Sequence, residues 1–286
     1  TADSENNGLG GVRVTMAGQV NSADAVTLTG SDLNADVTGT EAVQIDADGT
    51  TAQVLAGGDI TIRSGSGAPA ASDTEINGLV RSTGAASTIA ISANHDVLFG
   101  ANGDVTRSNA AASGRVSVFA DQATAGSTGG VITMADGTVF NGGGGQVELF
   151  ADGQLTLGQV ITTDLVNVVS LAANIVDGGN TGGEDVFAAR VAFFGKTGVG
   201  TDADSIETLS AAVAGQTDSG DFHIAGTGNV TVGTVLLTSN VTAALPGTPA
   251  SLSGILIDDT AGGTPIGDNL TVSATGAVTI NRSLTN

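Results

Sequence analysis

The chain lacks several residue types that mark common protein classes. It contains no cysteine, no tryptophan and no tyrosine, and it has only 4 prolines in 286 residues. Without cysteine it can form neither disulfides nor thiolate metal sites. The low proline content excludes a collagen-like or proline-rich chain. No apolar run approaches the ~18 residues of a membrane-spanning helix, so we expect no insertion into a membrane.

Positive charge is also scarce. Lys and Arg together number 8 against 29 Asp and Glu, which gives a formal net charge of −21. Phosphate backbones and anionic headgroups would be repelled by such a surface, so the sequence predicts no nucleic-acid partner. The excess of acid is typical of a solvated, self-repelling surface, and divalent-cation binding is the alternative.

Small aliphatic residues and glycine are abundant instead. Hydrophobic residues make up 40% of the chain, most of them Ala, Val, Ile and Leu, and there are 44 glycines. A core of medium-sized aliphatic side chains with so much glycine suits thin, regular layers better than a globule packed around large aromatic rings.

An eight-residue pattern recurs along the chain. An apolar residue is followed by a second one two positions later, by glycine at the sixth position and by the next apolar residue at the eighth. Clear copies begin at Val97, Val147, Phe222 and Leu270, and weaker copies begin at Val131 and Val139. Strand starts are therefore predicted at 131, 139, 147 and 155. In the copy that begins at Ile89, His95 takes the place of the glycine.

Alternation of apolar residues with threonine accompanies this repeat. The threonines stand at positions 27, 61, 156, 231, 271 and 279, each between two apolar residues. Such alternation indicates short strands with one buried face, and glycine at a constant step indicates turns that need a positive φ. Eight residues leave no room for a crossover helix. The pattern favours an all-β parallel β-solenoid over antiparallel hairpins, since stacked coils form aliphatic ladders without aromatic residues.

The predicted solenoid is an elongated rod. With ~20 to 24 residues per coil, about a dozen coils rising ~4.8 Å each give a length on the order of 60 Å. We expect one continuous segment over 1–286, a piece of a longer repetitive protein, with loop excursions near 63–77 and 244–269. Residues 205–215 space Ile206, Leu209 and Val213 like one face of a helix, so a single helical turn is an alternative there.

One stretch resembles a known family. Residues 171–234, which contain GVGTDADSIET and GDFHIAGTGNVTVGT, look like the repeat text of giant bacterial adhesins similar to filamentous haemagglutinin, and 57–65 and 92–108 are similar in style. The resemblance implies a right-handed parallel β-helix, export through an outer-membrane secretion pore, and a fibrous shaft that carries an adhesive tip. The amino-terminal secretion domain of that family is not recognisable in this chain.

Acidic clusters are the candidate chemical sites. They occur at 46–49, 182–185 and 201–204, and the predicted calcium ligands are Asp46, Asp48, Asp202 and Asp204. A polysaccharide-acting lyase or hydrolase needs carboxylates that converge beside a basic residue, for which Arg63, Arg115 and Arg190 are the candidates. The alternative is that Asp only makes turns. For His95 and His223 the sequence favours a solvated or packing role.

These features predict a structural and adhesive β-solenoid module of a bacterial surface or secreted fibrous protein, without enzyme activity and without a required cofactor. Expected partners are further copies stacked end to end or flanking repeats, because open coils expose unpaired strand edges. A cell-surface glycan or protein receptor is the expected adhesive partner. The alternatives are a β-helix enzyme that acts on polysaccharide and a calcium-stabilised acidic surface-layer-type repeat protein.

Overall fold

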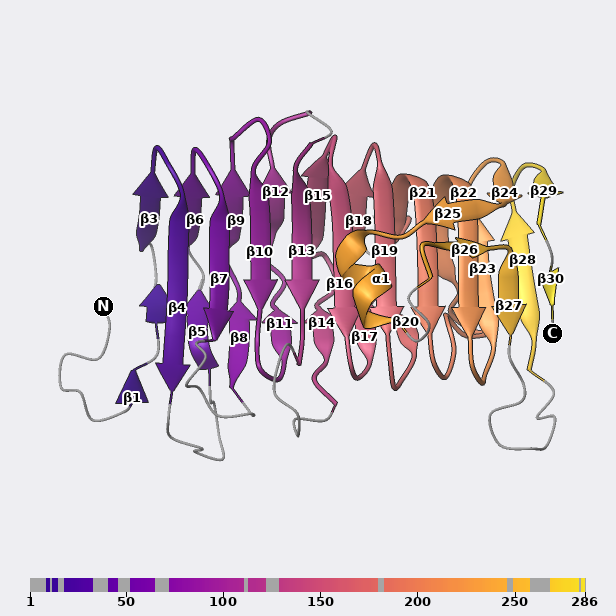
Figure 1. The fold of residues 1–286 in the computed structure, drawn as a ribbon, viewed down its shortest axis with the longest axis horizontal. Coiled ribbons are helices and arrows are strands. Elements are labelled where there is room, and N and C mark those ends of the chain that lie inside the picture. The colour runs from indigo at the N-terminus through magenta and orange to yellow at the C-terminus, as the bar shows by residue number, and fades with distance from the viewer. Residues whose placement is uncertain are drawn as a thin grey trace.

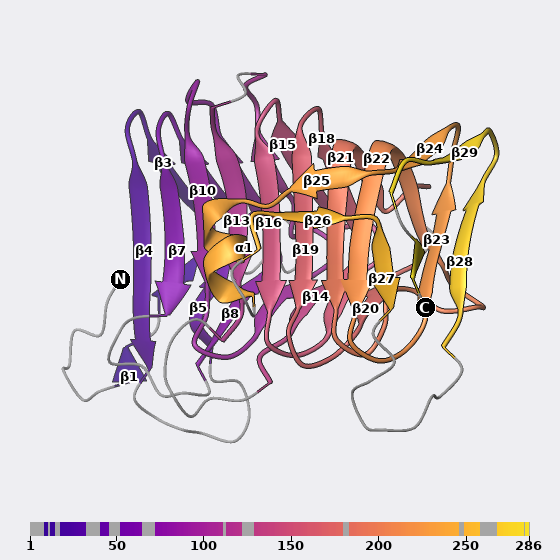
Figure 2. The same ribbon diagram turned by 45° about the vertical axis from the view of Figure 1, so that its right-hand side comes forward.

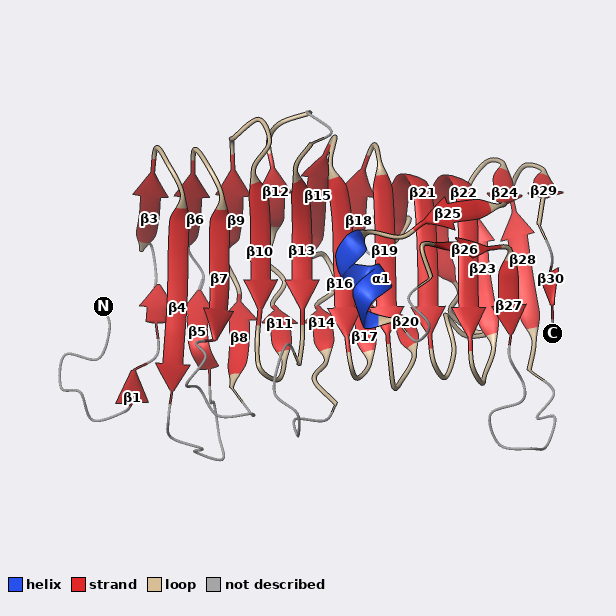
Figure 3. Cartoon of the chain, in the orientation of Figure 1, coloured by secondary structure: helices blue, strands red, loops and turns tan. Residues whose placement is uncertain are grey.

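The fold is nearly all β. The computed structural model describes residues 9–10, 12–14, 18–32, 41–45, 52–64, 72–110, 113–121, 129–179, 183–245, 249–257, 268–282 and 284–285. Within these ranges the strands form parallel sheets, and one short helix is present (Figure 3). None of the described segments is a helix with the length and apolar character that crossing a bilayer requires. The strands stand side by side along the long axis of the molecule, from β3 near the N-terminus to β29 near the C-terminus (Figure 1).

Three faces of strands run along this axis. The first face consists of β2 (Val12–Val14), β5 (Glu41–Ile45), β8 (Asp73–Ile76), β11 (Val97–Phe99), β14 (Ile132–Met134), β17 (Leu155–Leu157) and β20 (Ile175–Asp177). The second contains β3 (Gln19–Ser22), β6 (Gln53–Ala56), β9 (Leu79–Ser82), β12 (Val105–Arg107), β15 (Val139–Gly143) and β18 (Gln159–Thr162). The third contains β4 (Val26–Asp32), β7 (Ile60–Ser64), β10 (Thr88–Ser92), β13 (Arg115–Phe119), β16 (Gln146–Ala151) and β19 (Leu165–Ser170).

Two long strands continue the second and third faces together. β21 (Val186–Gly195) pairs with β18 through its first half and with β19 through its second half, and β22 (Ile206–Thr217) follows it in parallel. The last coils contain β23 (Phe222–Gly226), β24 (Val230–Val232), β27 (Ile255–Ile257), β28 (Leu270–Ala274), β29 (Val278–Ile280) and β30 (Leu284–Thr285). Only β1 (Leu9–Gly10) with β4, and β25 (Thr234–Leu236) with β26 (Ser251–Ser253), pair antiparallel among the described strands.

The repeat length varies along the stack. The ladder of the first face passes through Val12, Val43, Thr74, Val97, Ile132, Leu155, Ile175, Val199, Phe222 and Leu270. We call the chain between two successive members a coil. From Ile132 to Phe222 the coils have the predicted 20 to 24 residues, but Phe222 and Leu270 are 48 residues apart. The predicted coil length is therefore wrong for most coils toward both ends, although the coil from Thr74 to Val97 fits it. A loop can lengthen freely between strands that keep their register.

The eight-residue pattern corresponds to one face of one coil. β14, β15 and β16 lie on three different faces, and Ile132 of β14 then pairs with Leu155 at the start of the next coil. The strand starts predicted at 131, 139, 147 and 155 are thus confirmed to within one residue. The six threonines of the apolar-Thr-apolar segments are half-buried or exposed, whereas their apolar neighbours in β7, β17 and β24 are buried.

Aliphatic ladders fill the interior. On the third face Ile60, Ile89, Val116 and Val147 pair in register and are fully buried. Burying one such side chain contributes roughly 1.5–3 kcal/mol, so repetition over many coils supplies the stability that large aromatic residues give to other cores. The few phenylalanines pack against each other where they do occur; the ring centroids of Phe99 and Phe140 are 4.6 Å apart.

Glycine serves two different purposes in the turns. Gly137 and Gly228 have φ of +87° and +82°, which confirms the predicted left-handed turn at these positions. Gly153 occupies the same place in the repeat for another reason. A Cβ atom on Gly153 would lie 2.5 Å from the carbonyl oxygen of Gly129 in the preceding coil. There the residue is small because two coils approach closely.

Three local predictions are corrected by the structure. Residues 205–215 lie almost wholly in β22, because parallel pairing with β21 overrides the helical spacing of the apolar residues. The predicted loop at 63–77 contains the end of β7 and all of β8, and its residues 65–71 lie outside the described part. The predicted loop at 244–269 contains β26 and β27, and its residues 246–248 and 258–267 lie outside the described part. The helix is α1 (Ser239–Ala244), which the sequence pattern did not indicate.

Candidate functional site

Aspartates and asparagines at the corners of the coils bind the neighbouring coil. In seven cases an Asp or Asn at the start of a strand accepts, with its side-chain oxygen, a hydrogen bond from the backbone N–H of the equivalent residue one coil later. Six of these residues directly precede a strand, and Asp73 is the first residue of β8. The N–H donors and their acceptors are Thr88 and Asp59, Asp96 and Asp73, Val131 and Asp96, Val139 and Asp104, Glu207 and Asp185, Asn269 and Asp221, and Ala277 and Asn229, at 2.6 to 2.9 Å.

Each of these corner hydrogen bonds solves a backbone problem. At a corner the chain bends out of the ladder, and four of the seven bonds are partly buried there, where an N–H without a partner is costly. Asp104 shows how one residue links three coils: its carbonyl oxygen accepts the N–H of Val80 at 2.8 Å, and its carboxylate accepts the N–H of Val139 at 2.9 Å. Part of the acidic excess therefore stabilises the stack itself.

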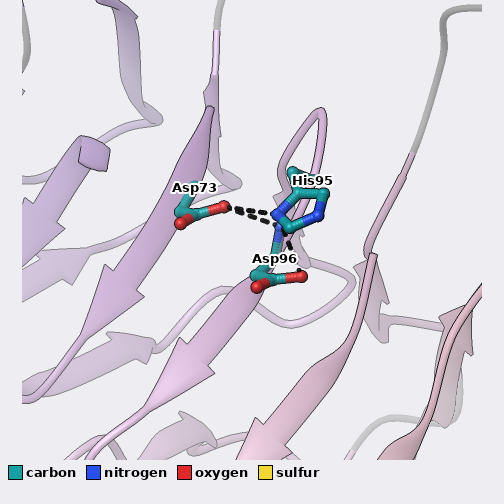
Figure 4. A group of neighbouring side chains, drawn as sticks. All are labelled: Asp73, His95 and Asp96. Atoms are coloured by element: carbon teal, nitrogen blue, oxygen red, sulfur yellow. Dashed lines mark hydrogen bonds and ion pairs between the residues drawn. The ribbon is translucent and has the colours of Figure 1, made fainter. Parts of the chain in front are cut away.

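Both histidines of the chain lie between two aspartates. Nδ1 of His95 is 3.1 Å from Oδ1 of Asp73 and 3.2 Å from Oδ1 of Asp96 (Figure 4). Asp73 begins β8 and Asp96 directly precedes β11, the next strand of the same face, so the stacking of two coils brings the carboxylates together. The three side chains are 34%, 19% and 20% exposed in the order His95, Asp73, Asp96. We call this group the His95 site.

The environment of the His95 site favours positive charge. Burial raises the pKa of Asp73, and the charge of Asp96 raises it further, whereas hydrogen bonds from the Asp96 N–H and from His95 lower it. Two carboxylates that face one nitrogen need a proton or a cation between them.

His223 occupies a more enclosed position. Its side chain is 1% exposed, its Nδ1 lies 3.4 Å from Oδ1 of Asp202, and its Nε2 lies 3.3 Å from Oδ2 of Asp221. The two carboxylates approach opposite ring nitrogens, so they do not form a shared ligand set with the ring. The sequence predicted a solvated or a packing role for both histidines, and the burial of His223 excludes the solvated role for it. The contacts of His95 with two carboxylates are more specific than that prediction.

A second acidic group lies near the end of β20. Carboxylate oxygens of Asp177, Asp185 and Glu207 lie within 4.8 Å of one another. Asp185 is 2% exposed, and burial, followed by the charge of Asp177, raises its pKa to about 9. The pKa of Glu207 is also raised, first by burial. Asp185 therefore retains a proton at neutral pH and can share it with a neighbouring carboxylate, so the cluster does not require an ion.

Two of the four predicted calcium ligands, Asp202 and Asp204, lie in the described part of the chain. Asp202 is 82% exposed on its side chain and contacts His223, whereas Asp204 interacts with Asp177, whose charge adds to desolvation in raising the pKa of Asp204. Asp46 and Asp48 lie outside the described residues. Among the described residues, the groups of three potential metal ligands contain neither Asp202 nor Asp204.

The three candidate arginines have other roles. Arg115 donates to Oε1 of Glu148, which is fully buried, and Arg190 pairs with Asp164. Nε of Arg63 lies 3.5 Å from the hydroxyl of Thr29. Each of the three arginines thus has a side-chain partner outside the acidic group around Asp185.

A strap covers part of the outside of the third face. It consists of β25, α1 and β26, and it lies across β16, β19, β21 and β22 in both ribbon views (Figures 1 and 2). Outward-facing Phe150, Val169 and Phe194 form a ladder in register, and Val241 and Leu245 of the strap pack on them. The N–H of Thr238 donates to the buried Asn167 side chain at 2.9 Å, and Asn240 donates to Glu148 at 3.0 Å. These bonds fix the strap on the sheet.

Beside α1 the same face is hollowed. The hollow has a volume of about 500 Å³ and is lined by hydroxyl groups, by Phe119 and Asn240, and by Arg63 and Arg115. It therefore combines two of the eight cationic side chains of the chain with hydrogen-bonding groups and one aromatic ring.

Sequence reasoning missed the His95 site and the corner hydrogen bonds. A usable signal was present, because Asp or Asn directly precedes an apolar residue at 59, 96, 104, 185, 221 and 229. The partner of each such residue depends on the coil length, which no local pattern specifies.

Comparison with known proteins gives no match: no family model, no curated protein and no solved structure matches this chain. The resemblance to filamentous-haemagglutinin-like adhesins therefore stays a prediction.

Proposed function

We propose that the chain is a right-handed parallel β-helix that serves as a stiff structural and adhesive module of a bacterial surface or secreted fibrous protein. The observation that carries the proposal is the ladder of the first face, in which ten successive positions pair in one direction along the axis. Such stacking resists bending, since successive coils pair through their backbones and corner hydrogen bonds add further links between several of them.

The exterior is consistent with a fibre that stays in solution and contacts a partner locally. A net charge of −21 keeps shafts apart. The hollow beside α1 offers arginine, hydroxyl and aromatic groups to a glycan or a protein receptor.

The last described coil supports stacking on another coil. Val278 and Ile280 of β29 are 40% and 52% exposed, although the equivalent residues Val230 and Val232 one coil earlier are fully buried. A flanking coil or a second copy packed there would cover them.

Spin labels can test the shaft directly, because the chain has no native cysteine. Thr27 and Thr279 are both exposed and lie in the first and the last described coils, nine coil steps apart. At ~4.8 Å per step, labels at Thr27→Cys and Thr279→Cys should be separated by on the order of 40 Å in pulsed EPR. Labels at Thr27→Cys and Thr61→Cys, which pair in adjacent coils, are the matched short-distance control. A short or broad end-to-end distance would refute the stacked shaft.

Adhesion needs a separate measurement. Beads coated with the folded segment should retain glycans or cells in a screen, and Arg63→Ala should reduce retention if the hollow is the contact surface. Arg81→Ala is the matched control, because Arg81 is an exposed strand arginine on the second face. Equal retention by both variants would show that the contact surface lies elsewhere on the molecule.

A further inference from the structure

We infer that Asp73, His95 and Asp96 form a binding site for a divalent transition-metal ion such as Zn²⁺, Mn²⁺ or Co²⁺. The inference is independent of the proposed function, since it uses only the contacts between two neighbouring coils. It differs from the predicted calcium site in both residues and chemistry.

Distances in the His95 site match the spacing of metal ligands. Zn²⁺ binds imidazole nitrogen and carboxylate oxygen at about 2.0–2.2 Å. Two ligands at that distance, at angles between octahedral and tetrahedral, are separated by about 2.9–3.5 Å. Nδ1 of His95 lies 3.1 Å and 3.2 Å from the two Oδ1 atoms, and the three atoms lie within 4.8 Å of one another. One ion can therefore contact all three atoms after small side-chain adjustments.

Backbone N–H groups fix the positions of the two carboxylates. Oδ1 of Asp73 accepts the N–H of Asp96 at 2.9 Å, and Oδ1 of Asp96 accepts the N–H of Val131 at 2.8 Å. Each oxygen has two lone pairs, so each keeps one for a ligand after making its corner hydrogen bond. Outer hydrogen bonds of this kind orient metal-binding carboxylates and reduce the cost of arranging the site.

Donor type and access select the class of ion. One imidazole and two carboxylates form a mixed nitrogen and oxygen set, which suits Zn²⁺, Mn²⁺ or Co²⁺, whereas Ca²⁺ takes oxygen ligands alone. The partial exposure of all three side chains leaves room for water to complete the coordination. A dication also balances both carboxylate charges, whereas a proton on His95 would balance only one of them.

Cobalt binding tests the inference with a spectroscopic readout. The full chain, freed of metal with a chelator, is titrated with Co²⁺ at neutral pH, and absorption and calorimetry are recorded. We expect one saturable equivalent per chain, displaced by Zn²⁺, together with a rise in the thermal midpoint that follows saturation. Asp96→Asn and His95→Gln should each weaken binding by more than about tenfold.

The variants separate binding from folding. Asparagine at 96 keeps an oxygen that can accept the Val131 N–H, so the corner hydrogen bond survives while the charge is lost. Asp202→Asn is the matched control, because it removes the carboxylate beside the other histidine, and it should bind Co²⁺ like the parent chain. Circular dichroism of each variant establishes that it is folded. The inference is overturned if the parent chain shows no saturable binding at millimolar Co²⁺, or if folded Asp96→Asn and His95→Gln bind as tightly as Asp202→Asn.

Discussion

Replacing Asp104 by alanine tests whether acidic corners stabilise the stack. The substitution removes the acceptor of the Val139 N–H, whereas the backbone bond from Val80 to the Asp104 carbonyl remains. A hydrogen bond to a charged group contributes about 1.5–3 kcal/mol, and Val139 is half-buried, so water only partly replaces the lost acceptor. We therefore expect local stability around Val139 to fall by that amount.

Hydrogen exchange measures this loss at the affected amide. At 1.36 kcal/mol per tenfold change, the Val139 amide should exchange about 10- to 150-fold faster in Asp104→Ala than in the parent chain. Asp104→Asn should lie between them, because its neutral amide oxygen still accepts. Asp24→Ala is the control, since this exposed aspartate lies in a corner and, within the described part of the chain, its carboxylate accepts no corner hydrogen bond. Unchanged exchange at Val139 in Asp104→Ala would show that the carboxylate contributes nothing, and the role assigned to the corner residues would be wrong.

Three further predictions concern charge, the strap and the close approach of coils. The pKa of Asp185 is raised from its ordinary value of 3.8 to about 9, so the folded chain keeps a proton that the unfolded chain loses. The free energy of unfolding should therefore fall as pH rises from about 4 to about 9, by at most ~1.4 kcal/mol per pH unit. Asp185→Asn should flatten this slope in urea titrations, and an identical slope in both chains would exclude Asp185 as its source. Val241→Asp places a carboxylate in the fully buried contact of α1, so we expect the free energy of unfolding to fall by about 3 kcal/mol or more and a hydrophobic dye to bind more strongly. An unaltered urea midpoint without dye binding would contradict this packing. Gly153→Ala should lower the free energy of unfolding by about 1–3 kcal/mol, because the new Cβ would meet the Gly129 carbonyl. Gly233→Ala is the control and should lower it less, since the nearest contact of a Cβ there is at 4.0 Å. Equal losses would argue against close approach as the reason for glycine at 153.

The amino-acid sequence determined the local units of the fold. Alternation such as Leu155-Thr156-Leu157 specifies a short strand with one buried face, and the eight-residue step places three such strands in one coil where the repeat is regular. Both are short-range properties, because they depend on the pleat of a strand and on the space needed for a turn. The outward position of the threonines and the scarcity of aromatic residues in the core follow from the same pattern.

Only the tertiary structure decided which coils meet. His95 and Asp73 are 22 residues apart, and Val139 and Asp104 are 35 residues apart, because the intervening coils differ in length. The strap is a stronger case, since α1 contacts strands far earlier in the chain and the Asn240–Glu148 bond spans 92 positions. The spacing of residues in a sequence does not encode such distances; register comes from the packing of whole ladders, which selects the partners of every corner side chain.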